Sequence, residues 1–282
     1  NRPSQEQLDV FYRDEFFQSC KPNYAREERE DIAWHQMLFA DRLNDFTDLL
    51  GRKPESILDI GCGTGVFLNW LEASGMKRCI GVEPNQQARS QSMSGMRILP
   101  FQNLDEISET FDIVVLQFVL EHLLNPEAII RQAVAHLKPD GILYVCCPND
   151  FTEIQYRAAE AIGKPFYWVH VPDHVSYFSF DSLEKLLAKC GLQPVLRDCT
   201  FAMEGFLLTG GLDYTADTKL GRYLHKIRMV YELALDRADH SNRRNLMRRM
   251  AMAGRGRDCI IYSKNKGDRC SRCGETLKQH PE

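Results

Sequence analysis

The pattern of apolar and polar residues predicts a sheet of parallel strands that alternate with helices through the middle of the chain. Short apolar runs mark strands at 56–60, 79–83, 96–99, 111–116, 141–147, 194–199 and 258–263. Amphipathic patterns mark helices at 65–74, 85–93, 126–137 and 181–190. This alternation is typical of an α/β fold with a doubly wound, mostly parallel sheet and helices on both of its faces.

Helical patterns also lie outside this alternation. A helix start at 3–6 and a long pattern over 24–50 predict N-terminal helices, and residues 200–257 form a long, mostly helical insertion before the last strand. We therefore expect an N-terminal helical cap at 1–50, a core at 51–200, a substrate-side insertion at 201–257, a last strand at 258–264 and a tail at 265–282.

Composition narrows the classes of protein without changing the expected fold. With 282 residues, 44% of them hydrophobic, 26% charged and a net charge of −4, the chain has an ordinary globular balance and gives no general case for nucleic-acid binding. We find no apolar run of membrane-spanning length and no signal peptide. Several of the ten cysteines, such as Cys79, Cys146 and Cys147, fall in predicted core strands, so we expect reduced thiols and a cytoplasmic protein.

The turn after the first strand carries the clearest chemical signal. Asp59 precedes three glycines at alternate positions, Gly61, Gly63 and Gly65, and a helix follows. Glycine allows positive φ and close approach of a ligand to the backbone, and the helix N-terminus favours an anionic or polar group. The spacing differs from the G-x-G-x-x-G fingerprint of dinucleotide-binding proteins. Glu83 ends the second strand, where a Rossmann-type sheet places a carboxylate against a ribose diol.

At these residues the chain resembles the class I S-adenosylmethionine (SAM) methyltransferases, whose first motif is similar to residues 58–65. Residues 111–149 resemble one branch of that class, which includes ubiquinone-biosynthesis O-methyltransferases and many sugar and natural-product methyltransferases. The shared features are a Glu-His pair at 121–122, a Lys-Pro-Gly-Gly-like turn at 138–141 and a strand that ends in Pro-Asn at 148–149. Asp140 stands where the family usually has the first glycine of that turn, which an Asp-Gly pair serves equally well.

The resemblance spans about residues 50–200, including a His-x-x-Tyr-Phe-Ser pattern that begins at His174. It implies an antiparallel seventh strand, SAM as cofactor and S-adenosylhomocysteine (SAH) as product. It also implies that Glu83 accepts hydrogen bonds from the ribose hydroxyls, that Asp59 binds the ammonium group of the methionine part and that the 101–104 loop contacts adenine. The expected cofactor site comprises Asp59, Gly61, Cys62, Gly63, Gly65, Glu83, Pro84, Phe101, Asn103, Leu104 and Gln117.

Methyl transfer needs a general base only if the acceptor must lose a proton, and histidine suits that role near neutral pH. Three histidines, His122, His170 and His174, are expected on the ligand side of the sheet, and we favour His174 slightly as the base. Structural hydrogen bonds are the alternative role for each. The N-terminal helices either cover an edge of the sheet or close over the cofactor, in which case Tyr12 and Tyr24 are the residues of interest.

We expect a small-molecule acceptor, first an oxygen of a sugar or of a nucleotide- or phosphate-linked sugar. A quinone- or polyketide-type acceptor, a nicotinamide-dependent oxidoreductase and a non-catalytic SAM-binding subunit are the alternatives. An arginine-lined pocket would favour the sugar and an apolar one the ring system. The arginines concerned are Arg243, Arg244, Arg248, Arg249, Arg255 and Arg257, which form either a solvated helix face or a phosphate-binding surface. The tail contains Cys270 and Cys273, whose C-x-x-C spacing is half of a zinc site. We expect free thiols and no bound metal there.

Overall fold

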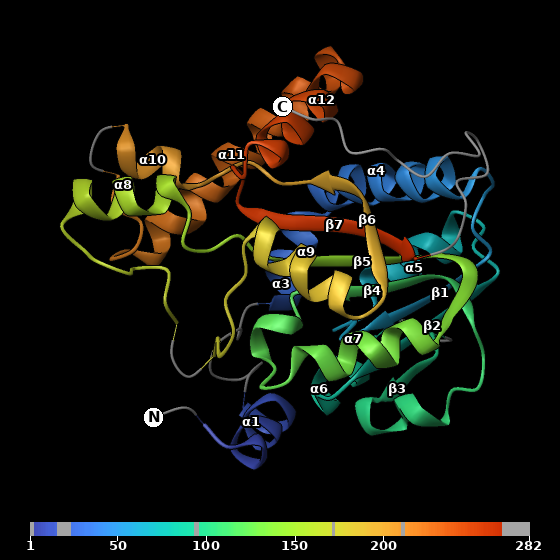
Figure 1. Ribbon diagram of the computed structural model, residues 1–282. Helices are drawn as coiled ribbons and strands as arrows, with labels where there is room; N and C mark the ends of the chain where they lie inside the picture. Colours follow the sequence, from blue (N-terminus) through green and yellow to red (C-terminus); the bar gives the residue numbers. More distant parts are fainter. Residues whose placement is uncertain (1–2, 16–23, 93–95, 171–172, 210–211, 267–282) are drawn as a thin grey trace.

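A seven-stranded sheet forms the centre of the computed structural model, which describes residues 3–15, 24–92, 96–170, 173–209 and 212–266 (Figure 1). Its strands are β1 (Ser56–Ile60), β2 (Arg78–Glu83), β3 (Ile98–Pro100), β4 (Phe111–Gln117), β5 (Leu137–Pro148), β6 (Leu192–Asp198) and β7 (Asp258–Asn265). They lie in the order β3-β2-β1-β4-β5-β7-β6, and β7 runs antiparallel to both of its neighbours. The other neighbouring pairs are parallel, which confirms the predicted doubly wound, mostly parallel sheet.

Helices cover both faces of this sheet and extend beyond its carboxyl edge. They are α1 (Gln5–Val10), α3 (Tyr24–Glu30), α4 (Ile32–Leu50), α5 (Val66–Ala73), α6 (Gln86–Ser90), α7 (Pro126–Ala135), α8 (Glu153–Ile162), α9 (Phe180–Lys189), α10 (Glu204–Leu208), α11 (Thr218–Ala238) and α12 (His240–Met252). Side chains of α4 and α5 pack with one apolar cluster of the sheet, and side chains of α7 and α9 pack with the other. Strands β1, β4 and β5 contribute to both clusters, so the core has two faces, as the pattern predicts.

The sequence signals that begin and end helices account for most of the boundaries. Ser4 caps α1 through a capping box, and Gly51 ends α4 in the left-handed conformation. Helix α8 was not expected, although Thr152 and Gln155 form a capping box at its start and Gly163 ends it. The strand β5 begins at Leu137, so the predicted turn at 138–141 lies within the strand. The pairing of β5 with β4 shifts register between Phe111 and Ile113 of β4.

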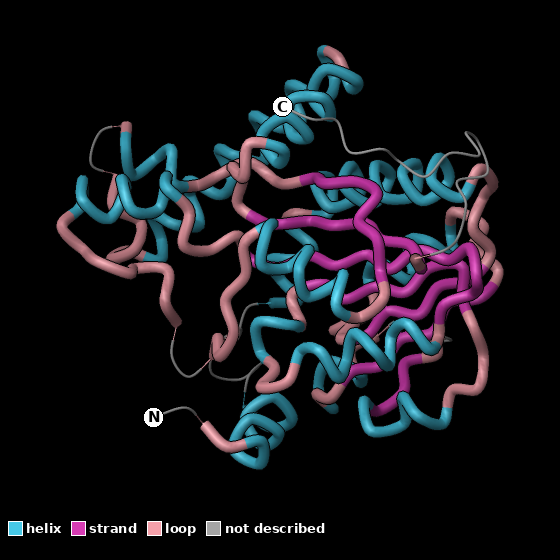
Figure 2. Tube along the Cα trace, in the orientation of Figure 1, coloured by secondary structure: helices cyan, strands magenta, loops and turns pink. Residues whose placement is uncertain are grey.

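The insertion divides between two parts of the molecule. Helix α10 lies beside α8 at the carboxyl edge of the sheet, whereas α11 and α12 reach back along α4 and the strand β6 (Figures 1 and 2). Within the described ranges, no helix is both long enough and apolar enough to cross a membrane. Cys270, Cys273 and most of the tail lie outside the described residues.

Candidate active site

The glycine turn after β1 is shaped by three residues with positive φ. Gly61, Gly63 and Gly65 have φ values of 80°, 56° and 77°. A Cβ at Gly61 would lie 2.5 Å from Cγ2 of Val119, so this position requires glycine for space as well as for conformation. The turn therefore lies at the carboxyl edge of the sheet, packed closely against the segment that follows β4.

Glu83 ties this turn to the end of β2. Its Oε2 accepts a hydrogen bond from the backbone N–H of Gly63 at 2.9 Å, and its Oε1 accepts one from the N–H of Asn85 at 2.8 Å. Burial raises the pKa of the Glu83 carboxyl, and the two backbone donors act against that rise. Each carboxylate oxygen has capacity for a second hydrogen bond, so Glu83 can also accept from the two hydroxyls of a diol.

Asp59 and Arg42 bring opposite charges to the same edge. Asp59 of β1 is buried, and that burial raises its pKa to about 7, against the lowering effect of Arg42. Arg42 of α4 is also buried; its Nη1 donates to Oε1 of Gln117 at 2.6 Å. Its guanidinium lies 5.2 Å from the ring centre of Tyr144. In the described parts of the chain, Arg42 has no carboxylate within ion-pair distance.

Arg42 is the main cofactor-side residue that sequence reasoning missed. The available signal was an arginine on the apolar, sheet-facing side of α4, where a charged side chain needs a partner. The hydrogen-bond partner of Arg42 in the protein is an amide, and Asp59 and the ring of Tyr144 compensate its charge in part from a longer distance. An anionic ligand group could provide the direct ion pair that the described residues do not.

The other expected cofactor residues lie around this edge in different ways. The side chain of Cys62 packs toward β2, where a Cβ at Gly81 would collide with it, so Cys62 offers its backbone to a ligand. A 3-10 helix after β3 contains the expected adenine contacts Phe101, Asn103 and Leu104. Leu104 is buried in the core, and Asn103 donates to Glu106 at 2.6 Å. Pro84 follows Glu83, with its carbonyl bonded to Arg89.

His122 lies in a polar cluster formed by three separate segments. Its Nδ1 lies 2.7 Å from the hydroxyl of Tyr12 and 3.2 Å from Oδ1 of Asp173. The pKa of His122 is raised: burial lowers it, but the hydrogen bond to Asp173 and the charge of Glu121 together outweigh burial. The N-terminal segment thus contacts the candidate acceptor side, and Asn85 holds it on the cofactor side by donating to the carbonyl of Tyr12 at 3.0 Å.

His174 lies next to His122, with 5.1 Å between the ring centres. Burial lowers the pKa of His174 to about 4, whereas burial raises the pKa of the Glu121 carboxyl to about 7. A donor set that could hold a divalent cation is formed by Glu121, His122 and His174. Each side chain offers one ligand atom, and these three atoms lie within 4.8 Å of one another. His170 lies 5.6 Å from His174 by ring centres, with its side chain exposed.

Aromatic rings continue from these histidines to the surface. Tyr177 lies 6.1 Å from His174 and 5.6 Å from Phe151, and Phe151 lies 5.6 Å from Trp168, measured between ring centres. Phe151 has a φ of 59°, which is unusual for a residue that is not glycine, and its side chain is 44% exposed. Strained backbone that presents an exposed ring is typical of a binding surface.

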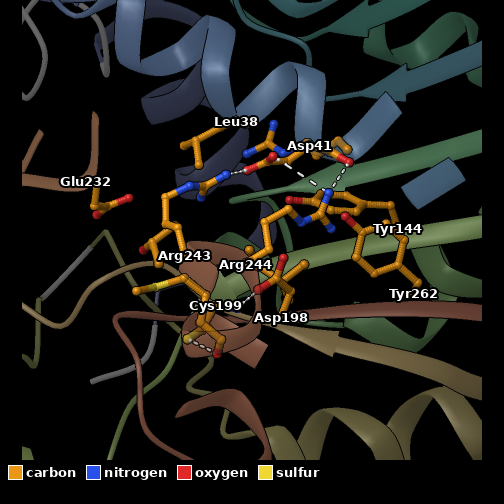
Figure 3. Close-up of a pocket in the computed structure, with 13 residues that line it drawn as sticks. Leu38, Asp41, Tyr144, Asp198, Cys199, Glu232, Arg243, Arg244 and Tyr262 are labelled. Atoms are coloured by element: carbon orange, nitrogen blue, oxygen red, sulfur yellow. Dashed lines mark hydrogen bonds and ion pairs between the residues drawn. The ribbon is translucent and has the colours of Figure 1, made fainter. Parts of the chain in front are cut away.

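The arginines of the insertion lie in different environments. Arg243 and Arg244 of α12 are buried, which rules out a solvated helix face for this pair. Arg243 donates to Asp41 of α4 at 2.5 Å (Figure 3). Arg244 pairs with Asp45 of the same helix.

Arg248 also pairs with Asp45, at 2.5 Å, and Arg257 pairs with Glu204 at 3.4 Å. Arg243 and Arg244 line a hollow between α4 and α12 with a volume of only about 20 Å³, room for one water molecule. Arg243 and Arg244 are each paired with an acid of α4, which weakens the phosphate-binding interpretation of this pair. Arg249 and Arg255 are exposed.

Comparisons with known proteins agree with this geometry. A family model described as a methyltransferase domain matches residues 32–196. A ubiquinone biosynthesis O-methyltransferase of Rhizobium rhizogenes is 27% identical over 170 residues, which covers 54% of this chain and 68% of that protein. A thiol S-methyltransferase of Homo sapiens is 27% identical over 162 residues, which covers 54% of this chain and 62% of that protein.

Solved structures resemble the chain over a greater length. The plantazolicin methyltransferase BamL, solved with a substrate analogue and SAH, has a TM-score of 0.55 and 16% identity, with 92% of this chain and 94% of that one covered. A SAM-dependent methyltransferase from Archaeoglobus fulgidus has a TM-score of 0.51 and 18% identity, with 82% of this chain and 94% of that one covered. At these identities, the likeness concerns the fold.

Proposed function

The chain belongs to the SAM-dependent methyltransferases, and we propose that it methylates a hydroxyl group on a small aromatic acceptor. The observation that carries the choice of acceptor is the row of rings that leads from His122 and His174 through Tyr177 to Phe151. A planar apolar acceptor can stack on such rings. The sugar phosphate that the sequence first suggested loses its support, because Asp41 and Asp45 neutralise Arg243 and Arg244.

On the cofactor side, we assign a role to each buried charge. Glu83 accepts hydrogen bonds from the ribose hydroxyls while its backbone donors hold it in place. Asp59 binds the ammonium group of the methionine part, and Arg42 binds its carboxylate. Gln117 is oriented by Arg42 and lies at the end of β4 beside the same part of the cofactor.

On the acceptor side, we assign the general base to His122 instead of His174. Asp173 accepts from Nδ1–H of His122, which makes Nε2 the nitrogen that takes the proton from the acceptor hydroxyl. SAM supplies an electrophilic methyl group when it is bound. Tyr12 and Asp173 fix the ring of His122, so the base is held in place before the acceptor arrives.

Calorimetric titration with SAH tests the cofactor site. We expect binding in the wild type and at least tenfold weaker binding in Glu83→Ala, because hydrogen bonds to charged groups are among the stronger ones. Glu72→Ala is the matched control, since Glu72 is exposed on α5, the helix that follows the glycine turn. Absence of SAH binding in the folded wild type would refute the assignment.

A further inference from the structure

Four buried oxygen atoms without a hydrogen-bond partner belong to residues that surround Arg257. They are Asn149 Oδ1, Asp150 Oδ2, Tyr167 Oη and Glu204 Oε2, counted within the described ranges. Asn149, Asp150 and Glu204 are each at most 3% exposed. Buried polar atoms in native proteins are normally satisfied, so this concentration of unsatisfied oxygens calls for an explanation.

Contacts with the segment 256–257 hold Asn149 and Glu204 beside it. The N–H of Asn149 donates to the carbonyl of Arg257 at 3.0 Å, and its side-chain amide donates to the carbonyl of Gly256 at 3.2 Å. Glu204 pairs with the guanidinium of Arg257 at 3.4 Å. Burial raises the pKa of Asp150 to about 6, with Glu204 adding to the rise and Arg257 opposing it. Asp150 therefore lies within electrostatic range of both.

The balance of groups in this cluster favours a cation. Three carboxyl groups, Asp150, Glu204 and Asp258, lie within electrostatic range of the single guanidinium of Arg257, and all four unsatisfied oxygens can accept hydrogen bonds. A primary ammonium has three N–H donors and no acceptor, so it matches both the charge and the surplus of acceptors. The ring of Tyr167 adds an aromatic surface of the kind that attracts cations.

We propose that Asn149, Asp150, Tyr167 and Glu204 form a subsite for a protonated amine carried by the methyl acceptor. The subsite lies next to the proposed reaction centre. The N–H of Asp150 donates to the carbonyl of Phe178 at 2.7 Å, and the ring of Phe151 lies 5.6 Å from that of Tyr177, which is a neighbour of His174. An aromatic acceptor that stacks on these rings can place an amine-bearing side chain among the four oxygens. This inference rests on the proposed function and narrows its substrate class to aromatic amines with a hydroxyl group.

The test compares two probes of similar shape on the protein saturated with SAH. Binding of 2-phenylethylamine and of 2-phenylethanol is measured by saturation-transfer NMR and calorimetry. We expect the wild type to bind the amine about tenfold more tightly than the alcohol, because only the amine offers a charged donor to the carboxylates. Glu204→Gln and Asp150→Asn, which keep the shapes of the side chains, should each remove most of that preference.

Glu160→Gln is the control, because Glu160 is an exposed acid on α8 whose ion pair with Arg157 lies at the surface. It should keep the full preference for the amine. Equal binding of amine and alcohol by the wild type would overturn the proposal, as would a preference that survives in both variants. If one variant does not fold, the other variant and the wild-type comparison still decide. Failure of SAH itself to bind would count against the proposed function, which separates the two results.

Discussion

Replacement of Asp45 by asparagine should destabilise the protein strongly, because Asp45 is the meeting point of the charges between α4 and α12. Its Oδ1 accepts from Arg244 and from Arg248, and its Oδ2 accepts from the hydroxyl of Tyr262 at 3.0 Å. Asp45→Asn keeps the volume but removes the charge and one acceptor. The buried guanidinium of Arg244 then keeps a hydrogen bond to the backbone carbonyl of Asp41 at 3.1 Å and the weaker ion pair with the Asp41 carboxylate at 3.6 Å.

The expected loss in the free energy of unfolding is about 3 kcal/mol. Breaking a buried ion pair by removing one partner costs about 3–5 kcal/mol, and the lower end applies because Asp41 compensates part of the charge of Arg244. Arg248 is partly exposed and can be hydrated, so it adds little to the loss. For a chain of this size, the melting temperature should fall by roughly 6–12 °C.

Urea unfolding, followed by circular dichroism and by tryptophan fluorescence, measures this loss. Asp48→Asn is the matched control, because Asp48 is exposed on the same helix, and it should change stability by less than about 0.5 kcal/mol. The double variant Asp45→Leu with Arg244→Met should recover much of the loss, since apolar residues of similar volume can replace a buried pair. The reasoning fails if Asp45→Asn is as stable as Asp48→Asn.

Three further predictions concern the cofactor and acceptor sides. The pKa of Asp59 is about 7, and we expect its charged form to bind the cofactor ammonium. The affinity for SAH, measured by calorimetry, should therefore rise as the pH increases through 7. Asp59→Asn should abolish that pH dependence. Gly61→Ala should weaken SAH binding at least tenfold, and Val119→Ala should partly restore it by removing the collision, leaving only the strain of positive φ. NMR titration should place the pKa of His122 above 6.5, and Asp173→Asn should lower it; an unchanged value would contradict the assigned partner.

The sheet and the glycine turn could be predicted because each is encoded locally. The strands β1, β2 and β4 are continuous apolar runs, and Gly61 needs both positive φ and the absence of a side chain. Glu83 follows from its place at the end of β2, because the carboxyl ends of parallel strands share one edge. These features depend on a few consecutive residues and on a general rule of topology.

The pairing of distant charges could not be predicted in this way. Arg244 and Asp45 are separated by 199 positions, and nothing in the local pattern of α12 distinguishes a buried arginine from a solvated one. Arg42 was missed for the same reason, since its value comes from its position next to Gln117. The choice between His122 and His174 likewise depends on Asp173 and Tyr12, which come from other segments. Such roles arise from tertiary packing.

Helix α4 connects the insertion with the cofactor edge. Asp41 and Asp45 bind the arginines of α12, and Arg42, adjacent to Asp41, reaches Gln117 at the end of β4. A rigid helix transmits a displacement along its length, so a shift of α4 away from α12 would also move Arg42 relative to Gln117. The insertion therefore stabilises, through Arg243 and Arg244, the position of the one buried arginine that we assign to the cofactor. This arrangement gives a physical reason for the burial of Arg243 and Arg244, because they fix the helix that carries Arg42.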